Sequence, residues 1–235
     1  MADVSFLRAR NEQDGMRALS RRAYDRQGSR HRRRIYAAKE IFIRFRSMTV
    51  LCRLSQLGER ICVMGPSNSG KSTLAEAIAR KLALGTIHLD QLYHLPNTNW
   101  QPRPEEQFLA LHDEAISGAR WVIDGNYSKC LPQRLQRATG MIILDISTAA
   151  SLFRYVRRTI SDPRRIGALE GYQDSIKMGM LHQILMVTPA NRKRYADLFQ
   201  QLSLPKVYLP SIRAIKACYQ DWGLEALPSH KGSAR

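Results

Sequence analysis

The sequence predicts an α/β fold in which helices cover both faces of a five-stranded parallel sheet. Short apolar segments, typical of buried strands, alternate along the chain with segments of helical periodicity. A glycine-rich motif lies between the first such strand and the first helix, and three later strands carry an aspartate at or near their carboxyl end. The expected strands are residues 60–64, 86–90, 121–127, 141–145 and 206–209.

The glycine-rich motif is a phosphate-binding loop. Residues 65–72 read Gly-Pro-Ser-Asn-Ser-Gly-Lys-Ser and fit G-x-x-x-x-G-K-[ST], between a predicted strand and a helix at 73–84. Gly65 and Gly70 can take backbone conformations that other residues avoid, so successive amide groups converge on one point. That point lies at a helix N-terminus, which favours an anion. The predicted nucleotide-binding residues are Gly65, Pro66, Ser67, Asn68, Ser69, Gly70, Lys71, Ser72 and Thr73.

Two side chains of the loop predict chemistry on a nucleoside triphosphate. Lys71 supplies a mobile cation for the β- and γ-phosphates, and Ser72 offers a hydroxyl to Mg²⁺. The expected cofactors are therefore Mg²⁺ and ATP, or another nucleoside triphosphate. The alternative, a glycine- and serine-rich turn that binds nothing, stays open at this point.

The composition suits one α/β domain with an appendage. The chain has 235 residues, of which 44% are hydrophobic, enough for a substantial core. Its four cysteines are scattered and form no C-x-x-C pair, which indicates a reducing compartment, and we expect a cytoplasmic protein. No apolar run approaches the roughly 20 residues of a membrane span, so no membrane partner is expected.

The net charge of +17 is concentrated toward the N-terminus. Residues 1–47 hold 13 Lys or Arg against 5 Asp or Glu. We expect residues 1–57 to form a basic, largely disordered extension, residues 58–227 the folded domain and residues 228–235 a loose tail. The basic arm either contacts nucleic acid or has no part in the function.

Aspartates at strand ends are candidate ligands, because ligands bind at the carboxyl edge of an open parallel sheet. Asp90 is placed to meet a substrate, or else it caps the turn that follows. Asp124 and Asp145 compete for the Mg²⁺ role. Asp124 is favoured because Gly125 leaves room for a ligand, while Asp145 remains the alternative.

The remaining histidines, methionines and arginines that stand out are expected either to support the fold or to stabilise charge. His88 and His94 have no partners at metal-ligand spacing and are interpreted as structural. The methionines at 178, 180 and 186 are expected in the core. In the helix that begins near residue 148, Arg154, Arg157 and Arg158 share one face. That face is either a solvated surface or part of a lid that brings arginines to a transferring phosphate.

The chain from about Gly58 to Leu227 resembles the nucleoside-monophosphate-kinase-like P-loop proteins. Within them it is most similar to the bacterial DNA topology modulation proteins, which are related to adenylate kinases. The matching segments are GPSNSGKSTLA at 65–75, HLDQLY at 88–93, WVIDGNYS at 121–128, LPQRLQRA at 131–138 and FRYVRR at 153–158.

The resemblance implies a three-layer P-loop NTPase sandwich with strand order 2-3-1-4-5 and a helical lid, and this order supports Asp124 over Asp145. It implies that Arg154 and Arg158 match the lid-side arginines of nucleotide kinases, and that Asp90, Tyr127 and Arg134 face the acceptor. The implied catalytic residues are Lys71, Asp124, Arg154 and Arg158, and the implied metal ligands are Ser72 and Asp124.

The sequence thus favours a phosphotransferase that acts on an unidentified small acceptor, with residues 91–118 and 159–188 as the walls of the acceptor site. Adenylate kinases usually continue the third-strand acid as Asp-Gly-Phe-Pro-Arg, whereas residues 124–127 here read Asp-Gly-Asn-Tyr. The acceptor is therefore unassigned. Two alternatives stay open: a nucleic-acid-associated P-loop NTPase or regulator, and a nucleotide-binding module without efficient chemistry.

Overall fold

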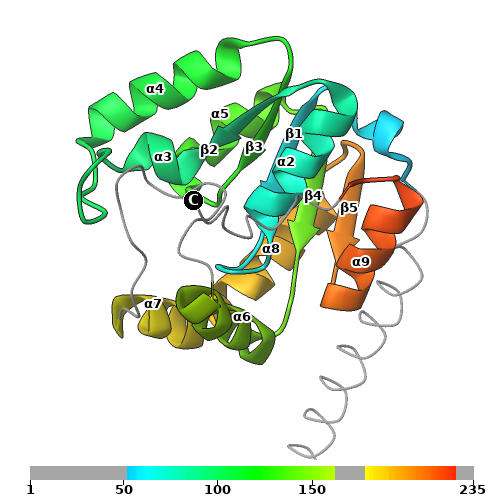
Figure 1. The fold of residues 1–235 in the computed structure, drawn as a ribbon. Helices are drawn as coiled ribbons and strands as arrows, with labels where there is room; N and C mark the ends of the chain where they lie inside the picture. Colours follow the sequence, from blue (N-terminus) through cyan, green and yellow to red (C-terminus); the bar gives the residue numbers. More distant parts are fainter. Residues whose placement is uncertain (1–51, 162–177, 226–235) are drawn as a thin grey trace, which may run out of the picture. The chain divides into compact units, whose positions relative to one another are not determined.

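The computed structural model describes residues 52–161 and 178–225, which all belong to one compact unit (Figure 1). Residues 1–51 of the predicted basic extension and the predicted tail, 228–235, lie outside the described residues.

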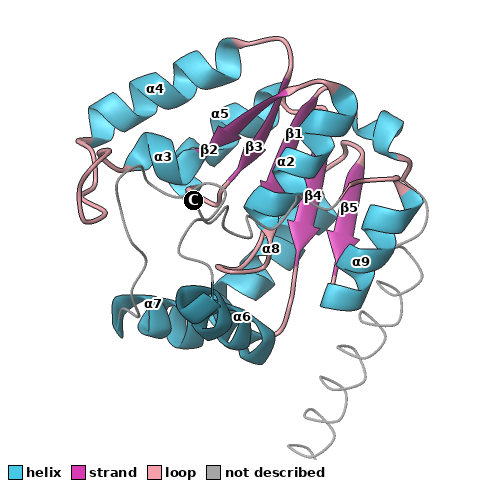
Figure 2. Ribbon diagram, viewed as in Figure 1, coloured by secondary structure: helices cyan, strands magenta, loops and turns pink. Residues whose placement is uncertain are grey.

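Five parallel strands form a single sheet in the order β2-β3-β1-β4-β5, as predicted (Figure 2). Strand β1, which leads into the phosphate loop, pairs with β3 and β4, so it lies in the centre of the sheet. The last residues of β2 and β3 are register partners, which brings His88 beside Asp124. The strands are β1 Arg60–Met64, β2 Gly85–His88, β3 Trp121–Asp124, β4 Gly140–Leu144 and β5 Lys206–Leu209.

Helices cover both faces of the sheet. Figure 1 shows α2 and α9 on one face, α5 and α8 on the other, and α6 and α7 beyond the carboxyl ends of the strands. The helices are α2 Lys71–Leu82, α3 Leu89–Tyr93, α4 Glu105–Ser117, α5 Leu131–Arg137, α6 Thr148–Ser161, α7 Met178–His182, α8 Thr188–Gln201 and α9 Ile212–Asp221. Shorter turns are 3₁₀ at Leu54–Leu57 and Ser128–Cys130 and π-helical at Gln183–Val187.

The helix that follows the phosphate loop is fixed by the core beneath it. Leu74 and Ile78 of α2 are fully buried and share one apolar cluster with Ile215 of α9 and the side chains of four strands. Burial of a side chain of this size contributes roughly 1.5–3 kcal/mol. The N-terminus of α2, where the loop ends, is therefore held firmly against the sheet.

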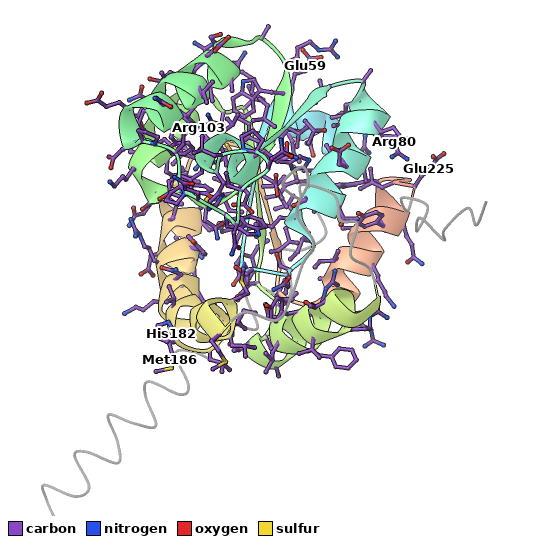
Figure 3. The ribbon with its side chains drawn as sticks, turned by 60° about the vertical axis from the view of Figure 1, so that its left-hand side comes forward. Glu59, Arg80, Arg103, His182, Met186 and Glu225 are labelled. Carbon is purple, nitrogen blue, oxygen red and sulfur yellow. The ribbon has the colours of Figure 1, made fainter. Side chains whose placement is uncertain are left out.

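Three expectations differ from the structure. Strand β2 ends at His88, so Asp90 lies in the first turn of α3 instead of at a strand end. The folded domain begins before Gly58, because the turn Leu54–Leu57 packs into the core. Met178 and Met186 are not core residues: they are 79% and 66% exposed, and Figure 3 shows Met186 near His182 at the lower edge of the view.

No helix within the described ranges is both long and apolar enough to pass through a lipid bilayer.

Strand β4 begins at a glycine that leaves no room for a side chain. A Cβ atom at Gly140 would lie 2.5 Å from the carbonyl oxygen of Leu57 and 2.7 Å from its Cβ. We expect Gly140→Ala to lower the free energy of unfolding by about 1–3 kcal/mol, because backbone atoms must move to admit the methyl group. The measurement is urea denaturation. The control is Gly85→Ala at the start of β2, where the methyl group would meet nothing within 4 Å; an equal loss there would contradict the packing argument.

Candidate active site

The phosphate loop connects β1 to α2 through three residues with positive φ. Gly65 has φ 145°, Gly70 has φ 97° and Asn68 has φ 61°. A Cβ atom at Gly65 would lie 2.4 Å from the carbonyl oxygen of Leu144 in the neighbouring strand. Glycine at position 65 is therefore required both by the backbone conformation and by the close approach of β4.

Two side chains from distant parts of the chain hold the loop in place. The Asn126 amide bonds the backbone of Gly65 twice: it accepts from the Gly65 amide at 3.0 Å and donates to the Gly65 carbonyl at 2.8 Å. On the other side, the Ser151 hydroxyl of α6 donates to the carbonyl oxygen of Ser67. The loop is thus tied both to the residues after β3 and to α6.

Polar atoms inside the loop fit an anionic ligand. Asn68 Nδ2 and Ser69 Oγ are buried and have no hydrogen-bond partner within the described part of the chain. A buried polar atom without a partner costs about 1–3 kcal/mol. The Lys71 ammonium group donates to the carbonyl oxygen of Pro66 at 2.9 Å, so its charge stays within the loop. These donors are the groups that a triphosphate tail would bind.

The hydroxyl and carboxylate predicted as Mg²⁺ ligands lie together. Ser72 Oγ donates to Asp124 Oδ2 at 2.6 Å, and Asp124 is only 5% exposed. Burial would raise the pKa of Asp124, but hydrogen bonds from His88 and Ser72 and the Lys71 charge outweigh it and lower the pKa. The carboxylate is therefore ionised at neutral pH.

This oxygen pair fits Mg²⁺, which is held in proteins by few side-chain oxygens together with phosphate and water. No cluster of three or more His, Cys, Asp or Glu side chains is placed to hold a metal ion in the portion of the chain that the structure describes. A metal at Ser72 and Asp124 would therefore depend on the nucleotide for further ligands.

Asp145, the alternative metal ligand, has other partners. Its carboxylate forms a two-point ion pair with the Arg192 guanidinium of α8, in which Nη2 to Oδ2 is 3.0 Å. The Tyr208 hydroxyl of β5 donates to the same Oδ2 at 2.5 Å. Asp145 thus connects α8 to the sheet, and Asp124 is the carboxylate that contacts Ser72.

Arg154 of α6 lies against the phosphate loop. A methyl group added to Gly70 would be 3.1 Å from Arg154 Nη2, so the guanidinium is beside the start of α2. Burial and repulsion from Arg157 both lower the pKa of Arg154. An anion bound in the loop would oppose both effects, because a nearby negative charge favours the charged guanidinium. The side chain of Arg158, the second predicted arginine, lies outside the described residues.

Asp90 and Tyr127, two of the three predicted acceptor residues, contact each other. The Tyr127 hydroxyl donates to Asp90 Oδ1 at 2.7 Å, and the Tyr127 ring packs against Tyr93 and Phe108 with centroid distances of 4.9 and 5.2 Å. Burial and the Asp90 charge raise the pKa of Tyr127, so its hydroxyl stays protonated. This pair forms one polar group beside an aromatic cluster.

Arg134, the third predicted acceptor residue, does not face an open site. Its side chain is fully buried, at 0% exposure, and its guanidinium donates to the carbonyl oxygens of Gly125, Asn126 and Tyr127 at 3.2, 3.5 and 3.1 Å. The expectation is corrected for this reason: Arg134 shapes the loop after β3 from behind. Its Nε has no partner among the described residues.

A cavity of about 690 Å³ opens between that loop and α8. The loop side contributes residues 126–128 and Leu131, and α8 contributes residues between Asn191 and Gln201. The lining contains two cationic side chains, Lys193 and Arg194, and one carboxylate, that of Asp197, so it is basic. The volume is in the range of small-molecule sites. The predicted walls, 91–118 and 159–188, do not line it.

His88 and Glu76 complete the site and were not expected there. His88 Nδ1 is 2.5 Å from Asp124 Oδ1, and His88 Nε2 is 3.1 Å from Glu76 Oε1. Burial lowers the pKa of His88, but hydrogen bonds and charges from both carboxylates outweigh it, and the pKa is raised. The signal that could have revealed this contact is the strand order, which places the ends of β2 and β3 side by side.

Comparisons with known proteins do not assign the chain to a family. One of the solved structures that match the chain is a gluconokinase from Sinorhizobium meliloti 1021, with 19% sequence identity and a TM-score of 0.36. The match covers 63% of this chain and 99% of that chain. No protein-family model and no curated protein matches the sequence. The assignment of the chain to the P-loop α/β fold therefore rests on its strand order and its phosphate loop, and the resemblance to DNA topology modulation proteins stays a prediction.

Proposed function

We propose that this protein is an ATP- and Mg²⁺-dependent phosphotransferase that acts on a small acceptor. The observation that carries the proposal is the contact between Ser72 Oγ and Asp124 Oδ2, 2.6 Å apart beside the phosphate loop. A turn that bound nothing would have no need to bring a hydroxyl and an ionised, buried carboxylate together at the N-terminus of α2. The unpartnered polar atoms of Asn68 and Ser69 support the same function.

The residues divide the work between binding and charge stabilisation. The loop amides and Lys71 bind the donor phosphates, and Ser72 and Asp124 hold Mg²⁺, which neutralises charge on those phosphates when bound. Arg154 stabilises the charge that develops on the transferring group, because its guanidinium lies beside Gly70 at the loop. Phosphoryl transfer needs little covalent chemistry from the protein, so positioning and electrostatics suffice.

The cavity between the loop after β3 and α8 is the proposed acceptor site. Asn126 lines this cavity, and its side-chain amide also bonds the backbone of Gly65 in the phosphate loop. Lys193 and Arg194 have no ion-pair partner among the described residues, and the buried Arg134 adds positive charge behind the lining. Burial raises the pKa of Tyr195 in the same wall, while the charges of Arg194 and Arg134 oppose that rise. The acceptor is therefore proposed to carry a negative charge.

The test is a screen for phosphoryl transfer by the full chain with Mg²⁺ and γ-labelled ATP. The panel of acceptors contains phosphate monoesters, hydroxycarboxylates and neutral polyols. For each acceptor, the transfer of label from ATP is measured under single-turnover conditions. The expected result is label on an anionic acceptor, and label on a neutral polyol alone would overturn the choice of acceptor class. ATP binding without transfer to any acceptor would instead indicate the nucleotide-binding module.

Arg194→Ala should raise the KM of the anionic acceptor by about 10-fold, with the KM of ATP unchanged. A hydrogen bond to a charged group contributes about 1.5–3 kcal/mol, and 1.4 kcal/mol is a factor of ten. The control is Arg213→Ala, an exposed arginine on α9 that does not line the cavity. Steady-state kinetics with each substrate varied in turn are the measurement. Equal effects of the two substitutions on the acceptor KM would rule out this cavity.

A further inference from the structure

Four polar side chains, at the N-terminal end of α2 and at the ends of β2 and β3, form a continuous series of hydrogen bonds that begins and ends on α2. Ser72 bonds Asp124 at 2.6 Å, Asp124 is 2.5 Å from His88, and His88 is 3.1 Å from Glu76. Ser72 and Glu76 are one helical turn apart on α2, so they lie on the same face of that helix. The series therefore runs from α2 to β3, on to β2 and back to α2.

The two oxygens of Asp124 have different neighbours. Oδ1 is bonded to His88 and Oδ2 to Ser72. Rotation of the carboxylate would break both contacts, so the imidazole fixes which oxygen faces the loop. His88 is held in turn, because β2 and β3 pair in register at His88 and Asp124 and because Glu76 bonds its other nitrogen.

We infer that His88 is a positioning residue for the metal site: it holds the Asp124 carboxylate so that Oδ2 and Ser72 Oγ together face a metal ion bound with the nucleotide. Both ring nitrogens are within hydrogen-bond distance of carboxylate oxygens, Nδ1 of Asp124 and Nε2 of Glu76, so the ring is held between the two side chains. Side chains that hold metal ligands in this way typically contribute 10–100-fold to metal affinity. The inference rests on the proposed function, since it concerns the metal that accompanies ATP.

A purely structural role for His88 predicts a different result. A histidine that only connected β2 to α2 would, on removal, weaken the fold and alter ATP binding equally with and without metal. A positioning residue affects the metal-dependent part alone. The two roles therefore separate in a comparison of Mg²⁺-ATP with metal-free ATP, which needs no knowledge of the acceptor.

The experiment measures ATP binding by calorimetry, in Mg²⁺ and in EDTA, for the full-length protein and two variants. His88→Leu removes both hydrogen bonds, whereas His88→Asn keeps an amide donor near Asp124 and loses the contact with Glu76. We expect His88→Leu to weaken Mg²⁺-ATP binding by about 10–100-fold and metal-free ATP binding by less than about twofold. His88→Asn should restore most of the loss. Circular dichroism and thermal denaturation show whether each variant is folded.

Each outcome decides a different point. Equal weakening of both forms of ATP, or no weakening of either, would overturn the positioning role and leave the proposed function intact. If His88→Leu does not fold, His88→Asn decides through the ratio of its Mg²⁺-ATP affinity to its metal-free ATP affinity: the residual loss should lower this ratio, and a ratio equal to that of the wild type or higher would overturn the role. A wild-type protein that binds ATP in neither condition would remove the proposed function and, with it, the inference.

Discussion

Lys71→Ala is expected to lower phosphoryl transfer by at least about 10²–10³-fold while the protein stays folded. Loss of one preorganised group that stabilises transition-state charge has an effect of this size. In the structure the Lys71 ammonium group is bonded to the Pro66 carbonyl within the loop, where a triphosphate would bind. Alanine is the best helix former, so the start of α2 should tolerate the change. Single-turnover transfer from labelled ATP is the measurement.

The matched control for this substitution is Lys81→Ala in the last turn of the same helix. Lys81 is exposed and far along α2 from the loop, so its loss should leave transfer unchanged. Both variants should unfold at urea concentrations close to that of the wild type. Transfer that survives in Lys71→Ala would mean that the loop does not bind the donor phosphates.

The parts of the fold that the sequence predicted well have strong local signals. The motif at 65–72 and the apolar periodicity of the following helix correctly predicted the loop and α2. Strand β5 spans Lys206–Leu209, the range that the sequence predicted. Such features depend on neighbouring residues, and the sequence shows them directly.

The parts that the sequence did not predict depend on contacts between distant residues. His88 looked structural because its partners, Glu76 and Asp124, are 12 and 36 residues away and match no ligand spacing. Arg134 was expected at the acceptor, yet its partners are backbone carbonyls, which leave no trace in a sequence. Met178 and Met186 were expected in the core because an apolar residue in a helical segment does not reveal whether another element covers it.

The position of Asp124 is an intermediate case. The sequence offered two strand-end acids, Asp124 and Asp145, and favoured Asp124 because of the neighbouring Gly125 and the strand order that the resemblance implies. In the structure Asp124 accepts a hydrogen bond from Ser72. Asp145 instead forms an ion pair with Arg192 and accepts a hydrogen bond from Tyr208. Both candidates could be named from the sequence, and the tertiary contacts show which of them bonds Ser72.

Asp124→Asn is expected to lower Mg²⁺-dependent transfer by about 10²–10³-fold, because the amide keeps the shape of the side chain and removes its negative charge. The pKa of Asp124 is lowered in the fold, so the wild-type residue presents a full carboxylate at neutral pH and the comparison is between an anion and a neutral amide. The measurement is transfer as a function of Mg²⁺ concentration. A loss of metal binding appears as a higher Mg²⁺ requirement.

Asp145→Asn gives the matched comparison, and the two aspartates should affect different quantities. Asp145→Asn weakens the ion pair with Arg192 and should lower the free energy of unfolding by about 1–2 kcal/mol. This value is smaller than that for a fully buried ion pair because the Arg192 side chain is 35% exposed. Transfer by the folded fraction should stay close to wild type. If instead Asp145→Asn raises the Mg²⁺ requirement and Asp124→Asn does not, the metal binds at the end of β4, and the Ser72–Asp124 contact serves only to join α2 to β3.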